Sequence, residues 1–397
     1  MRQFRVKKDA GGTSMNWKGK IGYLPAGYAA SAAKPGEKVS VCCREFLCAD
    51  DGAKLPFALE HLASPLLNMA PDGYRMGRGG IDHMIAVVTR ERDLSIWVNE
   101  PPVIARMLAK RSLAAGEEVR LSDIADIDRL EFEGLTVPND AGVLVVFSRD
   151  WERALFFDFE PLSGATKREY GLWGLLGSYY AYMTWRHVLG LSEAGWAQLM
   201  GQGWFPFMAL PEDLLRNVVS CAELGWSVDE LHLGKIGEFV RGQLREWLEQ
   251  WRGKSFLAEH LDFLAAACER YERGDFICAC SVLYTRIEGI LRSVKKLHTG
   301  TARGNQGSLA EWAIGGRGGS GHRETPLVPG RFREYLSRMY FAEFDADTPA
   351  SVSRHTVSHG VAPAVELNLK SATIGFLTLK QLLFYVGAAD SQAGRSA

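Results

Sequence analysis

The chain has 397 residues, of which 47% are apolar, so it contains enough apolar surface for a sizeable buried core. This length predicts two or three domains. With 46 Lys and Arg against 47 Asp and Glu, the formal net charge of −1 excludes binding to nucleic acid or membrane through overall charge, and such binding requires a local patch.

The N-terminus is basic but lacks the apolar stretch of a secretion signal, and the seven cysteines are an odd number. Free thiols in a reducing, cytoplasmic setting are therefore expected. Cys42, Cys43 and Cys48 are close in sequence but lack the paired spacing of a zinc site. The uncharged stretch 170–185 has 16 residues, fewer than the about 20 that a membrane helix needs, so no membrane association is expected.

Residues 1–165 are predicted to form an α+β domain. Four apolar runs stand in two pairs around charged turns: 84–89 with 94–99, and 143–148 with 153–159. β-Branched and aromatic residues dominate these runs, so each pair predicts a β-hairpin. Residues 102–110 predict a helix with proline at its start.

The strand signals stop at about residue 166, and residues 166–255 predict a Trp-rich helical region. Seven of the 11 tryptophans lie between Trp173 and Trp251, where large aromatic side chains fill a helical core. Residues 227–254 begin with a Ser-x-x-Glu capping box and keep their apolar residues on one helical face.

Residues 256–390 predict a helical bundle, so the fold class is α+β, with a mixed N-terminal region followed by a mainly helical chain. Apolar residues step by four and three in three sets: Leu257 to Tyr271, Phe276 to Val294, and Val365 to Val386. Such seams pack helices nearly antiparallel. Residues 330–344 predict a further helix, and the glycine-rich segment 298–326 predicts a mobile loop.

The segment SVSRHTVSHG, residues 351–360, places Arg354, His355 and His359 within six residues. Arginine grips a phosphate with a permanent charge, and histidine moves protons near neutral pH. Together they suit RNA cleavage, in which the substrate's own 2′-hydroxyl is the nucleophile and no metal is required. Arg354 and His359 are about 140° apart around an ideal helix, so they converge only if Arg354 lies at the helix start.

Three other interpretations of this segment remain open from the residues alone. It can be a helix end with incidental polar residues. His355 and His359, spaced i and i+4, can be half of a zinc site, with Glu366 as the one further ligand in view. His359 can also complement the helix dipole before Gly360.

The segment SRHTVSHG resembles the signature of the HEPN superfamily, in which four to six residues separate an arginine from a histidine and a polar residue follows the arginine. VLYTRIEGILR, residues 282–292, resembles the first-helix segment of Apea-like prokaryotic members, and the long apolar helix after His359-Gly360 fits the same subgroup. The resemblance covers residues 256–390, about a third of the chain. The long glycine-rich insertion before the motif departs from the family pattern.

This resemblance implies a mostly helical, metal-independent endoribonuclease that uses no cofactor and has RNA as its partner. It assigns His359 as acid or base, Arg354 to the scissile phosphate, and His355 to orienting the pair or contacting phosphate. It also implies a homodimer with two facing motifs and a role in host defence or as a toxin. Some family members lack activity and act as RNA-binding or dimerising modules.

Glu288 and Arg292 are accessory candidates for the same cleft, with a surface ion pair as the alternative. Residues 292–338 carry nine Lys or Arg against three Asp or Glu. That surplus either guides an RNA backbone to the motif or belongs to a solvated loop. Nothing in residues 1–255 identifies a ligand or partner.

Overall fold

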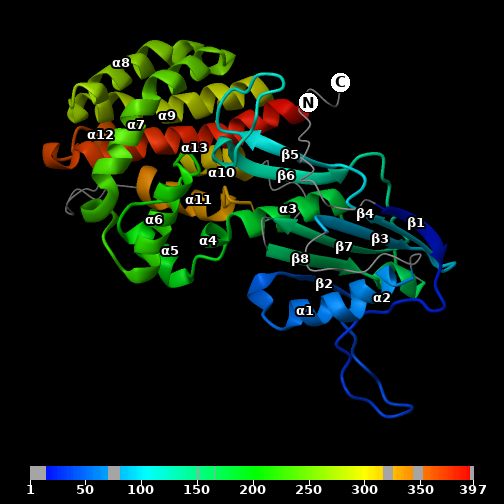
Figure 1. Cartoon of the computed structure of the whole chain (residues 1–397). Helices are drawn as coiled ribbons and strands as arrows, with labels where there is room; N and C mark the ends of the chain where they lie inside the picture. Colours follow the sequence, from blue (N-terminus) through cyan, green and yellow to red (C-terminus); the bar gives the residue numbers. More distant parts are fainter. Residues whose placement is uncertain are drawn as a thin grey trace. The chain divides into compact units, whose positions relative to one another are not determined.

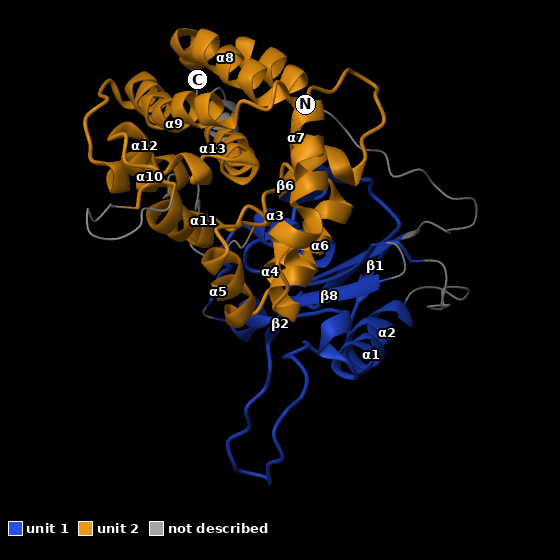
Figure 2. Cartoon of the chain, turned by 90° about the vertical axis from the view of Figure 1, so that its left-hand side faces the viewer, with its two compact units in different colours: residues 1–106, 128–184 blue, residues 107–127, 185–397 orange. Residues whose placement is uncertain are grey.

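The computed structural model describes residues 15–69, 81–149, 152–164, 166–315, 325–342 and 352–393. The chain divides into two compact units, coloured separately in Figure 2: residues 1–106 with 128–184, and residues 107–127 with 185–397. The first unit extends past residue 165 because α3 (Leu172–Thr184) packs on its sheet. The Trp-rich region beyond α3 and the helical bundle belong to one unit.

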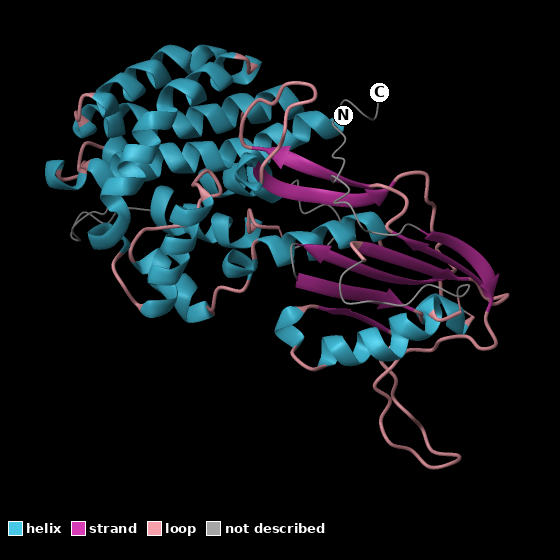
Figure 3. Cartoon of the chain, viewed as in Figure 1, coloured by secondary structure: helices cyan, strands magenta, loops and turns pink. Residues whose placement is uncertain are grey.

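Six antiparallel strands form the sheet of the first unit in the order β1-β4-β3-β7-β8-β2 (Figures 1 and 3). Their bounds are Met15–Lys20 (β1), Arg44–Leu47 (β2), His83–Val88 (β3), Asp93–Val98 (β4), Gly142–Arg149 (β7) and Glu152–Asp158 (β8). Both predicted hairpins are confirmed, because β3 pairs with β4 and β7 pairs with β8. The edge strands β1 and β2 were not predicted.

Helical segments cover both faces of this sheet, which explains why β3 is buried along its whole length. Met84 and Val88 of β3 belong to an apolar cluster with α1 (Lys54–Ala58), the π-helical turn Leu59–Ala63, and α2 (Ser64–Leu67). Tyr179 of α3 stacks on Phe46 at a centroid distance of 4.0 Å. Because successive strand residues point to opposite faces, α3 covers the face opposite α1 and α2.

Residues 103–109 form a strand, so the helix predicted at 102–110 is wrong. β5 (Val103–Ala109) pairs with β6 (Ile124–Phe132) in a separate two-stranded sheet. Arg106 of β5 and Glu131 of β6 form an ion pair, with Nη2 and Oε2 3.0 Å apart. The β-branched Val103 and Ile104 suit a strand, and β6, which begins 15 residues after β5 ends, supplies the hydrogen-bonding partner that the local sequence pattern does not reveal.

Every described element after Asp158 is helical, as predicted, and the α+β fold class is confirmed. The helices that follow α3 are α4 (Arg186–Leu189), α5 (Glu193–Gly201), α6 (Glu212–Leu224), α7 (Val228–Arg252), α8 (Leu261–Glu272), α9 (Phe276–Thr299), α10 (Gln306–Gly315), α11 (Pro329–Tyr335), α12 (Arg354–Ser358) and α13 (Leu369–Ala393). In the described part of the chain, no helix combines the length and apolar character needed to cross a bilayer.

Helix α13 is the central helix of the second unit. Nearly every side chain from 371 to 386 is buried, and α7, α9 and α10 pack against it. Its predicted seam holds only from Leu369 onward, because Val365 is 77% exposed and precedes the helix. The seams predicted for α8 and α9 are buried at Leu264, Cys268 and Cys280, among others.

Two further corrections concern segments beside the motif. The glycine-rich segment 298–326 is not all loop, because residues 306–315 form α10, with Leu309 and Ile314 buried. Residues 316–324 lie outside the described residues. The helix predicted at 330–344 is α11, which continues as a π-helical turn from Leu336 to Tyr340. This turn buries Tyr340 in place of Met339.

A lysine lies in the core of the second unit. Lys380 Nζ donates to Gln250 Oε1 at 2.6 Å and to the backbone oxygen of Lys110 at 3.2 Å. The rings of Trp247 and Phe384 lie beside its ammonium group. Burial lowers the pKa of Lys380 to about 8.

We expect Lys380→Met to remove part of the pH dependence of stability. The pKa of Lys380 is lower in the folded protein than in the unfolded chain, so the folded protein releases this proton first and gains stability as the pH rises above 8. Relative to the variant, the free energy of unfolding of the wild type should rise by about 2 kcal/mol from pH 8 to pH 10. Urea titrations of both proteins measure this difference, and a difference that stays constant would contradict a titrating Lys380.

Candidate functional site

The Arg-His-His segment forms a short helix of its own, α12, as the sequence pattern of its ends requires. Ser353 and Thr356 cap its N-terminus reciprocally: Ser353 Oγ accepts from the Thr356 N–H at 3.3 Å, and Thr356 Oγ1 accepts from the Ser353 N–H at 2.8 Å. Gly360, with a φ of 71°, follows its end. Arg354 is therefore the first helical residue, and His359 is the C-cap.

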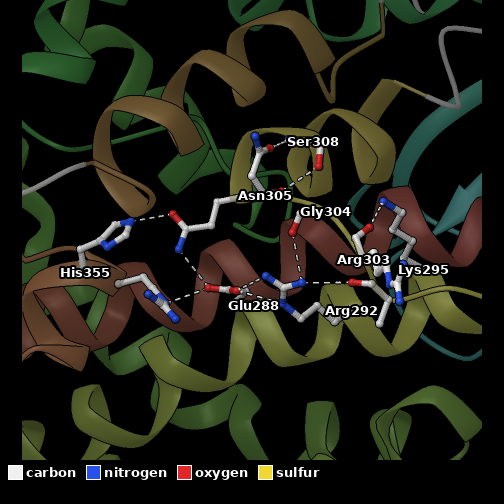
Figure 4. A network of polar contacts seen from close by, with 11 residues as sticks. Glu288, Arg292, Lys295, Arg303, Gly304, Asn305, Ser308 and His355 are labelled. Carbon is white, nitrogen blue, oxygen red and sulfur yellow. Dashed lines mark hydrogen bonds and ion pairs between the residues drawn. The ribbon is translucent and has the colours of Figure 1, made fainter.

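Glu288 of α9 forms an ion pair with Arg354, and Figure 4 shows Glu288 beside Arg292 of the same helix. Glu288 Oε2 lies 2.8 Å from Arg354 Nε, and Oε1 accepts from Arg292 at 2.9 Å from Nε and 2.7 Å from Nη2. Glu288 is 6% exposed, whereas the Arg354 side chain is 26% exposed. One buried carboxylate between two arginines leaves a local net charge of +1. The two arginine side chains are the more exposed members of this group.

The contact between Arg354 and Glu288 is an ion pair and not a hydrogen bond, because the Arg354 Nε–H does not point at the carboxylate. Within the described residues, no protein acceptor bonds the two Nη groups of Arg354. The guanidinium is thus anchored at Nε and keeps its outer donors available. Phosphate binding by Arg354 remains a prediction, and free outer donors are what such binding would require.

Gln306, at the start of α10, connects Glu288 of α9 with His355 of α12. Its Nε2 donates to Glu288 Oε2 at 3.1 Å, and its Oε1 lies 2.6 Å from His355 Nε2. Sequence reasoning missed Gln306 because the surrounding segment was predicted to be a loop. The signal that marks the helix start is Asn305, whose Oδ1 accepts from the Ser308 N–H at 2.8 Å.

His355 and His359 lie side by side on α12, as their i and i+4 spacing predicts. Their rings are parallel within 3°, with centroids 6.2 Å apart, and His359 is exposed. The structure therefore brings Arg354, His355, Glu288 and Arg292 into one network. His359 stands next to this network at the solvent.

The turn after α9 is tied to the same network (Figure 4). Arg292 Nη1 donates to the backbone oxygens of Ala302 and Gly304 at 3.0 and 3.2 Å, and Lys295 Nζ donates to the Arg303 oxygen at 2.6 Å. Gly304 has a φ of 146°, a conformation that side chains disfavour. These bonds fix the turn and place the exposed Arg303 beside the site.

The structure describes only part of the positive surplus predicted for residues 292–338, and it pairs several of the arginines with glutamates. Arg331, Arg333 and Arg338 each pair with a glutamate. Two of the other arginines, at positions 317 and 323, lie outside the described residues. The other positive side chains that the structure describes are Arg292, which pairs with Glu288, and Lys295, Lys296 and Arg303, all on α9 or the turn that follows it.

Tyr340 is a buried tyrosine close to Glu288. Its hydroxyl donates to the Tyr284 backbone oxygen at 2.5 Å. Burial raises the pKa of Tyr340 well above its ordinary value, and the nearby charge of Glu288 raises it further. Tyr340 is therefore neutral at physiological pH and acts as a hydrogen-bond donor in the core.

The described residues contain no cluster of three His, Cys, Asp or Glu side chains placed to hold a metal ion. His355 Nε2 is engaged by Gln306. Glu366, the third ligand considered from the sequence, lies in the short 3₁₀ turn Ala364–Glu366. The zinc interpretation therefore rests on the two histidines alone.

A cavity of about 230 Å³ in the second unit is separate from this network. Its lining includes Met339, Tyr340 and Lys370 but none of the motif residues. Lys370 is already paired with Asp229, with Nζ and Oδ2 2.6 Å apart. The motif residues therefore do not face this cavity.

Comparison of the chain with protein-family models, with curated proteins and with solved structures gave no match. Its own fold and site thus define its class: an α+β protein whose helical unit carries an arginine and two histidines on a capped helix, anchored to a buried glutamate.

Proposed function

We propose that the chain is a metal-independent endoribonuclease of the HEPN type, acting in a cytoplasmic defence or toxin-type setting. The observation that carries the proposal is the state of Arg354. Buried Glu288 holds its Nε, and its outer nitrogens face no acceptor in the described part of the protein. An arginine held in this way is preorganised to bind a phosphate next to His355 and His359.

The proposed reaction needs no cofactor. The 2′-oxygen of RNA attacks the adjacent phosphorus while its proton passes to a base, and the bond from phosphorus to the 5′-oxygen breaks while that oxygen gains a proton from an acid. The products are a 2′,3′-cyclic phosphate and a 5′-hydroxyl. His359 is exposed at the end of α12 and serves as acid or base, while Arg354 stabilises the charge on the phosphorane.

The basic turn beside the motif supports RNA as the substrate. Lys295, Lys296 and Arg303 lie on α9 and its following turn, next to the network that holds Arg354. A short row of positive side chains attracts an RNA backbone even though the whole chain carries a charge of only −1.

One motif supplies too few groups for both proton transfers, so we propose that the C-terminal helices form a homodimer with two facing motifs. Two apolar side chains just after the motif support a second copy there: Val361 is 41% exposed and Val365 is 77% exposed. Sedimentation should show a dimer at micromolar concentration, and a monomer both with and without RNA would contradict it.

Cleavage of RNA should persist in excess EDTA, because the proposed reaction uses only side chains and groups of the RNA and no metal ion. Incubation of a labelled RNA with the full chain, with and without chelator, measures this. Loss of cleavage on chelation and recovery with zinc would instead favour a metal held by His355 and His359.

The second candidate function is a non-catalytic RNA-binding or dimerising module. The observation that favours it is the same ion pair, since Glu288 partly neutralises Arg354. Filter binding and cleavage assays on the same RNA separate the two candidates. Binding without cleavage of any RNA tested would support the module.

A further inference from the structure

The contacts of Gln306 determine the direction of its side-chain amide. A carboxylate at neutral pH only accepts hydrogen bonds. The Gln306 group that faces Glu288 Oε2 at 3.1 Å must therefore be the NH₂ group, because the opposite orientation would place two oxygen atoms against each other. The amide oxygen then faces His355.

The same reasoning continues to His355. The amide oxygen of Gln306 is also only an acceptor, and it lies 2.6 Å from His355 Nε2. Nε2 must therefore carry a hydrogen, in the neutral imidazole and in the cation alike. The proton that His355 gains or loses is then the one on Nδ1.

We propose that Gln306 is a positioning residue, which locks His355 in the Nε2–H tautomer and confines its proton exchange to Nδ1. The role of His355 in RNA cleavage rests on the function proposed above, whereas the tautomer follows from the hydrogen bonds alone. For the reaction, this means that His355 meets a substrate proton or phosphate oxygen through Nδ1.

Glu288 anchors this series of hydrogen bonds. Glu288 is buried and held by Arg292 and Arg354, and the helix start at Asn305 fixes the backbone of Gln306. Among the described residues, the charged and titratable side chains that these contacts link to His355 are Glu288 and Arg292 from α9 and Arg354 and His359 from α12. The neutral amide of Gln306 keeps the carboxylate of Glu288 from direct contact with the imidazole.

The tautomer is measurable by long-range ¹H–¹⁵N NMR of the full chain labelled with ¹⁵N-histidine. Loss of signals in His355→Gln assigns them to His355. Neutral His355 should show a protonated Nε2 and an unprotonated Nδ1. Because free imidazole side chains also prefer a proton on this nitrogen, two substitutions at position 306 with opposite expectations make the test decisive.

Gln306→Lys replaces the acceptor by a donor, so neutral His355 should move its proton to Nδ1. Gln306→Glu keeps an acceptor, so Nε2–H should persist. Gly307→Lys is the matched control. It adds the same charge at an exposed position, where a Cβ meets only Asn305 Oδ1 at 3.8 Å, and it should leave the tautomer unchanged.

A wild-type His355 with its proton on Nδ1 would overturn the inference. So would a folded Gln306→Lys variant whose His355 nitrogen shifts match the wild type. If the tautomer responds as expected but no RNA is cleaved, the proposed function fails and the positioning role of Gln306 stands. If RNA is cleaved in EDTA while Gln306→Lys changes neither the tautomer nor the pH–rate profile, the positioning role fails alone.

Discussion

His359→Ala is expected to reduce RNA cleavage by roughly 100- to 10,000-fold, which is the usual contribution of a general acid or base. The fold should persist, because His359 is exposed and follows the last turn of α12. RNA affinity should change little, because the substitution leaves Arg354 and the basic turn after α9 in place. Single-turnover rates and binding to an uncleavable 2′-O-methyl RNA measure the two quantities separately.

Arg354 provides the matched contrast for this experiment. Arg354→Ala should weaken both binding and rate, whereas Arg354→Lys should restore binding more than rate, because lysine keeps the charge but not the planar fork. Thermal melts of each variant show whether it is folded. If folded His359→Ala cleaves RNA as fast as the wild type, the proposed site is wrong.

Glu288→Ala is expected to lower the free energy of unfolding by about 3 kcal/mol, at the low end for loss of one partner of a buried ion pair. The substitution leaves Arg292 and Arg354 without their shared carboxylate and leaves the Gln306 amide without its acceptor. The low end applies because the two arginine side chains are 36% and 26% exposed and water can solvate them. Urea unfolding followed by circular dichroism measures the change.

Glu269→Ala is the control for Glu288→Ala. Glu269 also pairs with an arginine one turn away, Arg273, at 2.5 Å, but both side chains are more than half exposed. Its loss should cost only about 0.3–0.5 kcal/mol. Equal effects of the two substitutions would mean that the buried carboxylate does not hold the site together.

Much of the fold follows from local patterns that a single sequence contains. The hairpins β3–β4 and β7–β8 were predictable because each consists of neighbouring runs joined by a short charged turn. Helices α7, α8 and α9 were predictable because each buries one stripe of apolar residues. In all these elements the partner is close in sequence or the burial is one-sided.

The incorrect predictions concern elements whose structure the local sequence pattern does not determine. Strand β5 depends on a partner in β6 that only the tertiary structure reveals. Helix α10 lies in a glycine-rich segment, and the composition of this segment does not indicate that Leu309 and Ile314 are buried. Val365 continues a helical pattern in sequence, but Pro363 and a 3₁₀ turn precede the true helix start at Leu369.

The candidate site was predictable in its residue types but not in its connections. Arg354, His355 and His359 were selected from their chemistry, and the structure places Arg354 at the capped start of α12. The link through Gln306 was not predictable. Gln306 is 18 positions from Glu288 and 49 positions from His355 in the chain. Contacts of this range leave no periodic trace in the sequence.

The most direct test of the nuclease proposal compares two substrates of the same sequence, one of RNA and one with every 2′-hydroxyl methylated, both in excess EDTA. The proposed reaction takes its nucleophile from the substrate, so the RNA should be cut to fragments ending in 2′,3′-cyclic phosphate, and the methylated strand should bind but stay intact. Cleavage of the methylated strand, or RNA products with 5′-phosphate ends, would contradict the proposal.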